Sequence, residues 1–419
     1  MYSTVKQSFN TDGANILEEK MTLSQRIIQQ TNEYCAHNYH PKDVVIEQAS
    51  GCIVVDPEGR EYYDMLSAYS AHNLGHRHPE VVAAAVEQLG KVTLTSRAFH
   101  NTVLGEFCQK LAQLTGKDMI LPMNTGAEAV ETAIKTARRW GVDVKGVVDG
   151  KQQIIVAENN FHGRTVTVVS FSTDPTARRG YGPFTDGFVV VEYGNADALE
   201  AAITDNTVAF LVEPIQGEAG IVVPPEGYLR KVREICTRHN ILFIADEIQT
   251  GFARTGKMFA CQHEGVVPDI FTLGKALGGG IMPVSAVAAN KDILGVFEPG
   301  SHGSTFGGNP LACAVGIKTM EILVRDDYAK QAREKGEYFM DKLREIAKSN
   351  PHIIQVRGKG LLVGVVFDIE AQGYVKKLIA NGVLAKETHE CIIRFAPPIV
   401  ITYEQIDDAC VKIAKALTE

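Results

Sequence analysis

Short apolar runs that alternate with helical patterns constrain the fold of this chain more than any other feature. The runs lie at 153–157, 207–212, 241–246, 270–273 and 284–289. Runs that are apolar at successive positions are typical of strands covered on both faces, as in parallel sheets. Apolar residues at helical spacing occur at 16–33, 79–90, 103–115, 127–141, 227–240, 309–325, 329–348 and 404–417. This alternation predicts an α/β fold with a mostly parallel sheet between helix layers.

The C-terminal part of the chain carries a second, smaller unit. Strand patterns near 353–357, 361–367 and 392–396 stand beside the last two long helical patterns, which predicts an α+β arrangement. With 419 residues, 45% of them hydrophobic, the chain is long enough for two domains with a deep core.

Two of the predicted strands end in residues suited to chemistry. Asp246 closes the run 241–246, and Lys275 follows the run 270–273, just before a glycine-rich loop. Ligands in open α/β sheets bind at the carboxyl ends of strands, so both side chains could face one pocket. A partly desolvated lysine has a lowered pKa and attacks carbonyl groups. A solvated loop lysine and an aspartate that caps a turn are the alternatives.

A buried aspartate needs a positive partner, and the pyridinium nitrogen of a vitamin-B6 cofactor is one. Gln249, three residues after Asp246, could donate to the phenolic oxygen of such a ring. The cofactor's phosphate would fit at Thr125 and Gly126, which begin the helical pattern 127–141, because helix N-termini attract anions. An ordinary N-cap is the alternative reading of this pair.

Other motifs and the composition exclude several classes of function. The segment 251–257 has the spacing of a nucleotide-binding phosphate loop, but Met258 offers no hydroxyl to magnesium. The histidines lack nearby acidic or cysteine clusters at ligand spacing, so no metal site is expected. A formal net charge of −8 without a long Lys/Arg run argues against nucleic acid as a partner. No apolar stretch reaches membrane-spanning length.

The cysteines and the first twenty residues indicate the cellular compartment of the protein. Eight cysteines are scattered without close pairs, which predicts free thiols in a reducing environment. The first twenty residues include Asp12, Glu18 and Glu19 and no arginine, unlike a secretory or transit peptide. We therefore expect a cytoplasmic protein.

Long runs of this sequence resemble the class III pyridoxal-phosphate aminotransferases, and within them most closely the ornithine-specific branch. The resemblance extends over almost the whole chain. It is carried by Pro122–Glu128, Val212–Gly220, Ala245–Gly251 and His302–Pro310, and by the terminal matches Tyr34–Pro41 and Ile393–Pro398.

The resemblance implies a set of cofactor contacts. Lys275 would hold pyridoxal 5'-phosphate covalently, Asp246 would pair with the ring nitrogen, Gln249 would contact the ring oxygen, and Phe161 would stack on the ring. The phosphate would be held by Thr125, Gly126 and Ala127 together with Thr305 of the neighbouring subunit. A homodimer with shared active sites follows from that last contact.

The resemblance also implies the reaction and its substrate contacts. The δ-amino group of ornithine would pass to 2-oxoglutarate in two half-reactions, giving glutamate 5-semialdehyde and glutamate. A bidentate pair of Glu218 with Arg394 would mask this arginine while ornithine reacts, and would open it for the keto acid. An ordinary structural ion pair is the alternative. The further substrate residues would be Tyr39, Tyr69, Arg164 and Glu213.

Other substrates remain open at this point. Another ω-amine such as N-acetylornithine, lysine or γ-aminobutyrate is possible. One segment departs from the family pattern, because His72-Asn73-Leu74 stands where relatives carry Val-Asn-Gln, and this change bears on substrate affinity.

The resemblance implies a fold-type I architecture in three parts. These are an N-terminal segment 1–78, which packs with the small domain and the dimer interface, a large cofactor domain 79–326 and a small C-terminal domain 327–419. The active site would lie between domains and subunits.

Overall fold

A seven-stranded sheet forms the centre of the protein in the computed structural model, which describes residues 21–418. The strand order is β4-β10-β9-β8-β7-β5-β6. Only β10 runs antiparallel to its neighbours, so the sheet is mostly parallel, as the sequence predicts. The strands are β4 Met119–Met123, β5 Gln153–Ala157, β6 Phe188–Val191, β7 Thr207–Val212, β8 Leu242–Asp246, β9 Ile270–Leu273 and β10 Ser285–Ala289.

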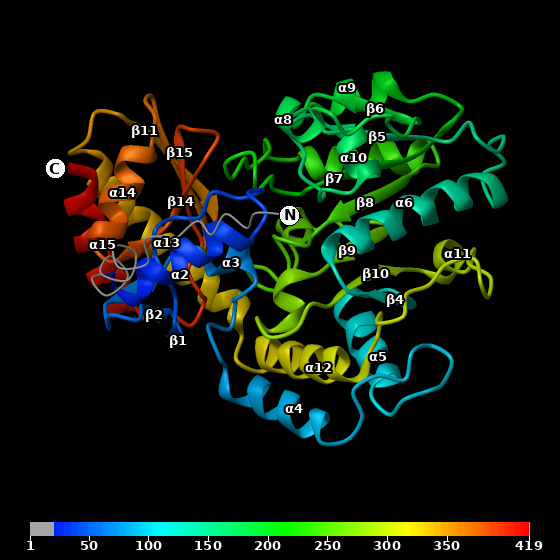
Figure 1. Cartoon of the computed structure of the whole chain (residues 1–419). Helices are drawn as coiled ribbons and strands as arrows, with labels where there is room; N and C mark the ends of the chain where they lie inside the picture. The colour runs from blue at the N-terminus through cyan, green and yellow to red at the C-terminus, as the bar shows by residue number, and fades with distance from the viewer. Residues whose placement is uncertain (1–20, 419) are drawn as a thin grey trace, which may run out of the picture.

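Helices cover both faces of this sheet (Figure 1). Successive residues of one strand contact opposite layers, because side chains alternate across a strand. In β7, Leu211 packs in the cluster that contains α6, Gly126–Asp143, whereas Phe210 packs in the cluster that contains α10, Tyr228–Arg238. This two-sided burial explains why β7 and β8 are apolar at every position except Thr207 and Asp246 at their ends.

The smaller part of the molecule is built on two four-stranded sheets. One is antiparallel and contains β11 Ile353–Lys359, β12 Leu362–Phe367, β15 Ile392–Phe395 and β14 Lys386–Thr388. The other combines β1 Gln48–Ser50, β2 Ile53–Val55 and β3 Glu61–Asp64 with β13 Val383–Leu384. Because β13 pairs with β3, the N-terminal segment joins the C-terminal part. The domain borders near 78 and 326 stay a prediction.

The remaining helices connect or cover these sheets. They are α2 Leu23–Tyr34, α3 Ser67–Ser70, α4 Pro79–Leu89, α5 Leu104–Thr115, α7 Val166–Ser170, α8 Pro175–Arg178, α9 Ala196–Ala202, α11 Lys291–Leu294, α12 Pro310–Arg325, α13 Tyr328–Ala347, α14 Gln372–Ala380 and α15 Tyr403–Thr418, with 3-10 turns at Ala260–Glu264 and Lys275–Gly278. None of the helices among residues 21–418 is long and apolar enough to cross a membrane.

The predicted elements are present, with differences at their ends. The first helix was expected from residue 16, whereas α2 begins at Leu23, because Thr22 caps it and exchanges hydrogen bonds with Gln25. Residues 16–20 of that prediction lie outside the described part. The sequence patterns missed β4 and β6, which are the two edge strands, and β4 contains Pro122, a residue that edge strands tolerate.

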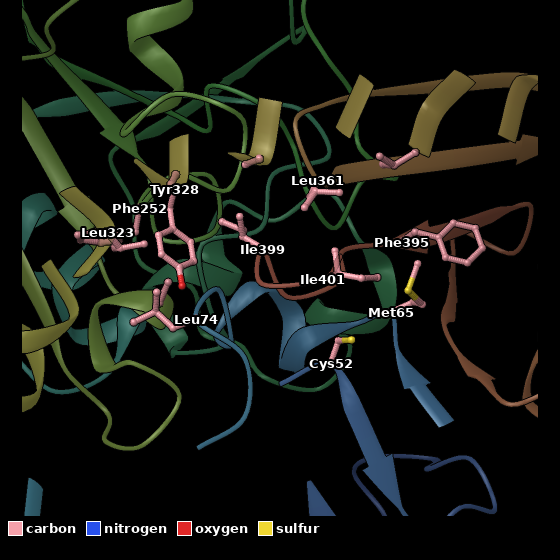
Figure 2. Packing of buried hydrophobic residues seen from close by; sticks show 14 of the residues in the cluster. Cys52, Met65, Leu74, Phe252, Leu323, Tyr328, Leu361, Phe395, Ile399 and Ile401 are labelled. Atoms are coloured by element: carbon pink, nitrogen blue, oxygen red, sulfur yellow. The ribbon is translucent and has the colours of Figure 1, made fainter. Parts of the chain in front are cut away.

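One hydrophobic cluster joins the two parts of the molecule. It contains Cys52, Met65 and Leu74 from the N-terminal segment, Phe252 and Leu323 from the large part, and Leu361, Phe395 and Ile399 from the C-terminal part (Figure 2). Burial of apolar surface in this cluster stabilises the contact between the two parts of the molecule.

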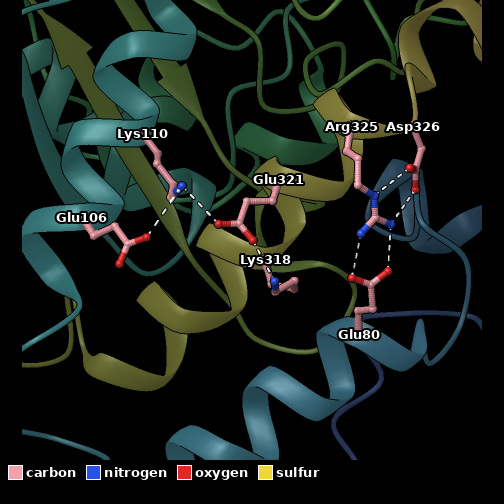
Figure 3. A network of polar contacts seen from close by, with 7 residues as sticks. All are labelled: Glu80, Glu106, Lys110, Lys318, Glu321, Arg325 and Asp326. Atoms are coloured by element: carbon pink, nitrogen blue, oxygen red, sulfur yellow. Dashed lines mark hydrogen bonds and ion pairs between the residues drawn. The ribbon is translucent and has the colours of Figure 1, made fainter.

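A network of exposed ion pairs links three helices at the surface (Figure 3). Arg325 at the end of α12 pairs with Glu80 of α4 and with Asp326, while Lys110 of α5 pairs with Glu321 of α12. Solvent screens exposed ion pairs of this kind, so the network contributes little to the free energy of unfolding.

Candidate active site

Lys275 and Asp246 line one cavity at the carboxyl ends of β8 and β9. The cavity has a volume of about 200 Å³. Seven residues of the predicted site line it: Gly126, Ala127, Phe161, Glu213, Asp246, Gln249 and Lys275. The structure therefore brings together residues that are more than half the length of the predicted cofactor domain apart in sequence, because adjacent parallel strands end at the same sheet edge.

Lys275 occupies an unusual backbone position. Its φ is 43°, in the left-handed region, at the start of a short 3-10 turn directly after β9. Lys275 lines the cavity, and the surrounding protein buries its ammonium group away from water. This desolvation lowers the pKa of the ammonium, although the negative charges of Asp246 and Glu218 oppose the shift. The amine is thus more readily available in its neutral, nucleophilic form.

Asp246 is held by three donors. Oδ1 accepts hydrogen bonds from the Thr272 hydroxyl at 3.0 Å and from the Ile248 N–H at 3.1 Å. Oδ2 lies 2.6 Å from Nδ1 of His162, which is fully buried. Burial opposes a charge on His162, but the hydrogen bond and charge of Asp246 outweigh it and raise the pKa of the imidazole. His162 is not among the residues predicted from the sequence, although it directly follows Phe161.

The N-terminus of α6 supplies an anion-binding position next to the lysine. Thr125 caps the helix, and Glu128 closes a capping box by accepting from the Thr125 N–H at 2.7 Å. A Cβ on Gly126 would approach the side chain of Ile248 to 3.1 Å, so Gly126 packs closely against Ile248. The following N–H groups have no carbonyl of a preceding turn to bind.

Glu218 and Arg394 meet at the outer side of the cavity. Arg394 Nη1 donates to Glu218 Oε1 at 2.7 Å, and Gln249 Nε2 donates to the same oxygen at 3.2 Å. The predicted bidentate pair is therefore wrong: one oxygen carries the contact, and Gln249 shares it. Burial raises the pKa of Glu218, but the charge and hydrogen bond of Arg394 outweigh this and lower it. Glu218 is thus an ionised carboxylate.

A second, outer cavity adjoins this pair. Its volume is about 480 Å³, and its lining includes Phe161, Arg164, Glu218 and Thr388. The Arg164 guanidinium carbon lies 5.5 Å from the centre of the Phe161 ring. The Arg394 guanidinium carbon lies 4.7 Å from the centre of the Tyr69 ring. Arg164 thus lines the outer cavity, and Arg394 lies beside Tyr69 and Glu218.

Three other predicted residues are absent from the lining of the outer cavity. Tyr39 is 66% exposed and lines a different cavity beside α2. Thr305 is exposed and stands outside the lysine cavity. Glu213 lies in the inner cavity, where its carboxylate accepts from the Phe161 N–H at 3.0 Å, rather than in the outer one with Arg164. Burial raises the pKa of Glu213 to about 7.

The segment that departs from the family pattern lies behind the glycine-rich loop. A Cβ on Gly280 would come within 2.3 Å of His72 Nδ1, and the His72 ring stacks on His76. His72 is absent from the lining of both cavities. Lys386, which bonds to Tyr69, was also missed, because it stands in a three-residue strand without a periodic signal.

Comparison with known proteins agrees with this geometry. Residues 34–417 match the family Aminotransferase class-III. The chain is 57% identical to an ornithine aminotransferase of Brevibacillus brevis, over 95% of this chain and 99% of the relative. A crystal structure of the ornithine aminotransferase from Toxoplasma gondii superposes with a TM-score of 0.93 at 43% identity, covering 98% of both chains. An acetylornithine aminotransferase from Elizabethkingia anophelis superposes with a TM-score of 0.87 at 47% identity, covering 95% of this chain and 99% of that one. The chain belongs to the class-III aminotransferase family.

Proposed function

We propose that this protein is an ornithine δ-aminotransferase, which uses pyridoxal 5'-phosphate to transfer the δ-amino group of ornithine to 2-oxoglutarate. The products are glutamate and glutamate 5-semialdehyde, which cyclises to pyrroline-5-carboxylate and so belongs to proline and arginine metabolism. The observation that carries the proposal is the Glu218–Arg394 pair, which is hydrogen-bonded to Gln249, a residue that lines the cavity of Lys275 and Asp246.

The residues present fit the cofactor. A buried carboxylate, Asp246, keeps both oxygens inside the cavity region and suits a protonated ring nitrogen. The N-terminus of α6 suits the phosphate, because Gly126 and Ala127 of its first turn line the cavity. Phe161 and Gln249 would contact the ring, and Lys275 would hold the aldehyde carbon. When bound, the cofactor supplies an electron-withdrawing ring that stabilises negative charge on the reacting carbon.

The side chains of the chain itself have separate tasks. Lys275, with its lowered pKa, takes and returns a proton at the substrate carbon that bears the amine. Asp246, which is hydrogen-bonded to His162, would face the ring nitrogen and hold its proton, which keeps the ring electron-poor.

Glu218 would adapt one site to two substrates. While Glu218 neutralises Arg394, the site favours a substrate whose reacting end has no carboxylate, such as the δ-end of ornithine. Because the contact rests on one oxygen, a competing carboxylate can displace it. The α-carboxylate of 2-oxoglutarate would then bind Arg394. At the other end, Arg164, Tyr69 and Tyr39 would hold the α-amino and α-carboxyl groups of ornithine.

Separate half-reactions test this function. Ornithine alone should convert the yellow enzyme to its aminated, bleached form, and 2-oxoglutarate should restore the colour. Glu218→Ala should leave Arg394 open, so the rate with glutamate as amino donor should rise relative to ornithine, by about 10-fold or more for one charged contact. Glu334→Ala, on the surface of α13, is the control. If Glu218→Ala lowered the rates of the ornithine and glutamate half-reactions equally, the proposal that Glu218 masks Arg394 would be contradicted.

N-acetylornithine is the second candidate donor. The similarity to the Elizabethkingia anophelis acetylornithine aminotransferase favours it. Its acetyl group removes the α-amino charge, so a site that recognises the free amine discriminates against it. Measuring bleaching by ornithine, N-acetylornithine, lysine and γ-aminobutyrate at equal concentrations separates these donors. Faster bleaching by N-acetylornithine than by ornithine would favour the second candidate.

We also infer a homodimer in the cytoplasm. The exposed Thr305 is followed by Phe306, which is 52% exposed, and this surface supports a contact in which Thr305 completes the phosphate site of a second copy. The eight free cysteines support a reducing compartment. Sedimentation of the purified protein tests the dimer.

A further inference from the structure

We propose that Lys386 is a positioning residue for substrate specificity, which directs the hydroxyl of Tyr69 toward a substrate carboxylate. The proposal rests on the proposed function, since it concerns how the same site binds an amino acid. The Lys386 ammonium donates to the Tyr69 hydroxyl at 2.8 Å and lies 5.4 Å from the centre of its ring.

Strand pairing places Lys386 beside Arg394, the arginine that pairs with Glu218. Lys386 is the first residue of β14 and stands directly opposite Arg394 in the register with β15. Residues opposite each other in an antiparallel pair project to the same face of the sheet. Both cations therefore approach the Tyr69 ring, with the Arg394 guanidinium carbon at 4.7 Å from its centre.

The backbone holds Tyr69 in a defined position. Ser67, Ala68, Tyr69 and Ser70 have φ values of 52°, 46°, 59° and 70°, so four consecutive residues lie in the left-handed region. Such a backbone costs free energy and persists only where the surroundings impose it. Asp64 imposes it in part, because its Oδ1 accepts from the N–H groups of Leu66 and Ser67 at 3.0 and 2.8 Å. Lys386 then fixes the hydroxyl at the far end of the ring.

The hydrogen bond with Lys386 determines how the Tyr69 hydroxyl can be used. An ammonium group has donors only, so the Tyr69 oxygen must be the acceptor of this bond. The O–H of Tyr69 is then free to donate to another group, for which a carboxylate is the strongest acceptor. Glu218 is occupied by Arg394, and within residues 21–418 no carboxylate lies within ion-pair distance of Lys386. The surplus positive charge around the ring therefore favours a substrate carboxylate.

The rest of β14 anchors the lysine to two other parts of the site. Glu387 pairs with Lys42 at 2.5 Å, which ties down the segment that follows Tyr39. The Thr388 hydroxyl donates to the backbone oxygen of Glu218 at 2.6 Å. Each residue of β14 thus contacts a different segment that carries a proposed substrate residue.

A double-mutant cycle tests the assignment. Lys386→Met removes the donor and keeps the chain length, and Tyr69→Phe removes the hydroxyl. Each single variant should raise the KM for ornithine about 10-fold, the effect of one lost hydrogen bond to a charged group, and change kcat less than about 2-fold. Because both remove the same contact, the double variant should have the KM of Tyr69→Phe.

Controls separate this role from simple destabilisation. Lys377→Met removes another lysine that lies over a tyrosine ring, that of Tyr374 on α14, and should leave KM unchanged. Lys386→Arg keeps a donor and should recover part of the lost affinity. Additive effects on KM, or a fall in kcat without a rise in KM, would overturn the proposal. The wild-type half-reaction with ornithine tests the function separately, and the cycle is measured with whichever ω-amino acid the wild type accepts.

Discussion

At the residue scale, the environment of Lys275 makes its amine reactive. It is desolvated, lies in a left-handed backbone position and faces Asp246 across one cavity. Lys275→Ala should abolish the visible absorbance of the cofactor-loaded protein and lower turnover roughly 10³-fold or more. Lys117→Met is a matched control, because Lys117 is also buried and has a burial-lowered pKa, but lies outside the cavity. A chromophore that borohydride still traps at another lysine would reject the assignment.

Glu213 gives the apoprotein a specific dependence on pH. Burial raises its pKa from 4.5 to about 7 in the folded state. Below pH 4.5 the carboxyl is protonated in both states, and between these values only the unfolded chain ionises it. The free energy of unfolding of the wild type, relative to Glu213→Gln, should therefore fall as pH rises from about 4.5 to 7, by about 3 kcal/mol, and stay constant above.

Urea denaturation of the two apoproteins at several pH values measures this difference. Titrating groups that do not interact with Glu213 contribute equally to both proteins and cancel, so the difference reports Glu213 together with its neighbours His162 and Asp246. A difference that is independent of pH between 4.5 and 7 would mean that Glu213 is ionised in the folded protein.

At the element scale, the contact of α13 with the turn at Gly360 illustrates how packing overrides helix propensity. A Cβ on Gly336 would lie 2.1 Å from the carbonyl oxygen of Gly360, and a backbone atom cannot rotate away. Alanine is favoured over glycine in a helix by about 1 kcal/mol, whereas overpacking costs about 1–3 kcal/mol. Gly336→Ala should therefore lower the free energy of unfolding.

The control for this prediction is another helical glycine. Gly105 in α5 has no atom within 4 Å of an added Cβ, so Gly105→Ala should be neutral or slightly stabilising. Thermal denaturation of both variants gives the comparison. If Gly336→Ala were as stable as Gly105→Ala, α13 could move away from the turn.

At the scale of the whole molecule, Arg254 connects three distant parts of the chain. It is fully buried, and its guanidinium donates to Asn73 Oδ1 at 2.6 and 3.0 Å and to the backbone oxygens of Leu361 and Pro397 at 2.9 and 2.6 Å. Burial lowers the pKa of Arg254 to about 9. The arginine inside the rejected phosphate-loop motif is therefore structural.

Loss of Arg254 should weaken the junction between the large and small parts. Arg254→Met would leave three buried acceptors without donors, at a cost of at least about 3 kcal/mol in the free energy of unfolding. Lys257→Met, three residues later on the exposed surface of the same loop, should change stability little. Urea denaturation measures both. A small effect of Arg254→Met would show that water satisfies these acceptors.

The amino-acid sequence alone determined five of the seven strands of the central sheet and the lysine–aspartate part of the site. Periodicity is a local property, so wholly apolar runs predicted β5, β7, β8, β9 and β10 within one residue at each end. Asp246, Lys275 and Gly126 could be placed because each terminates or begins such an element. The edge strands β4 and β6 were not predicted, because an edge strand is less buried and its sequence need not be apolar at every position.

Only the tertiary structure decided which side chains meet across the molecule. His162 reaches Asp246 over 84 residues of chain, Glu218 reaches Arg394 over 176, and Lys386 reaches Tyr69 over 317. No local pattern encodes such pairs, because they depend on strand order, register and the packing of the two parts. The one-oxygen geometry of the gate likewise follows from Gln249, which the fold places beside the same carboxylate.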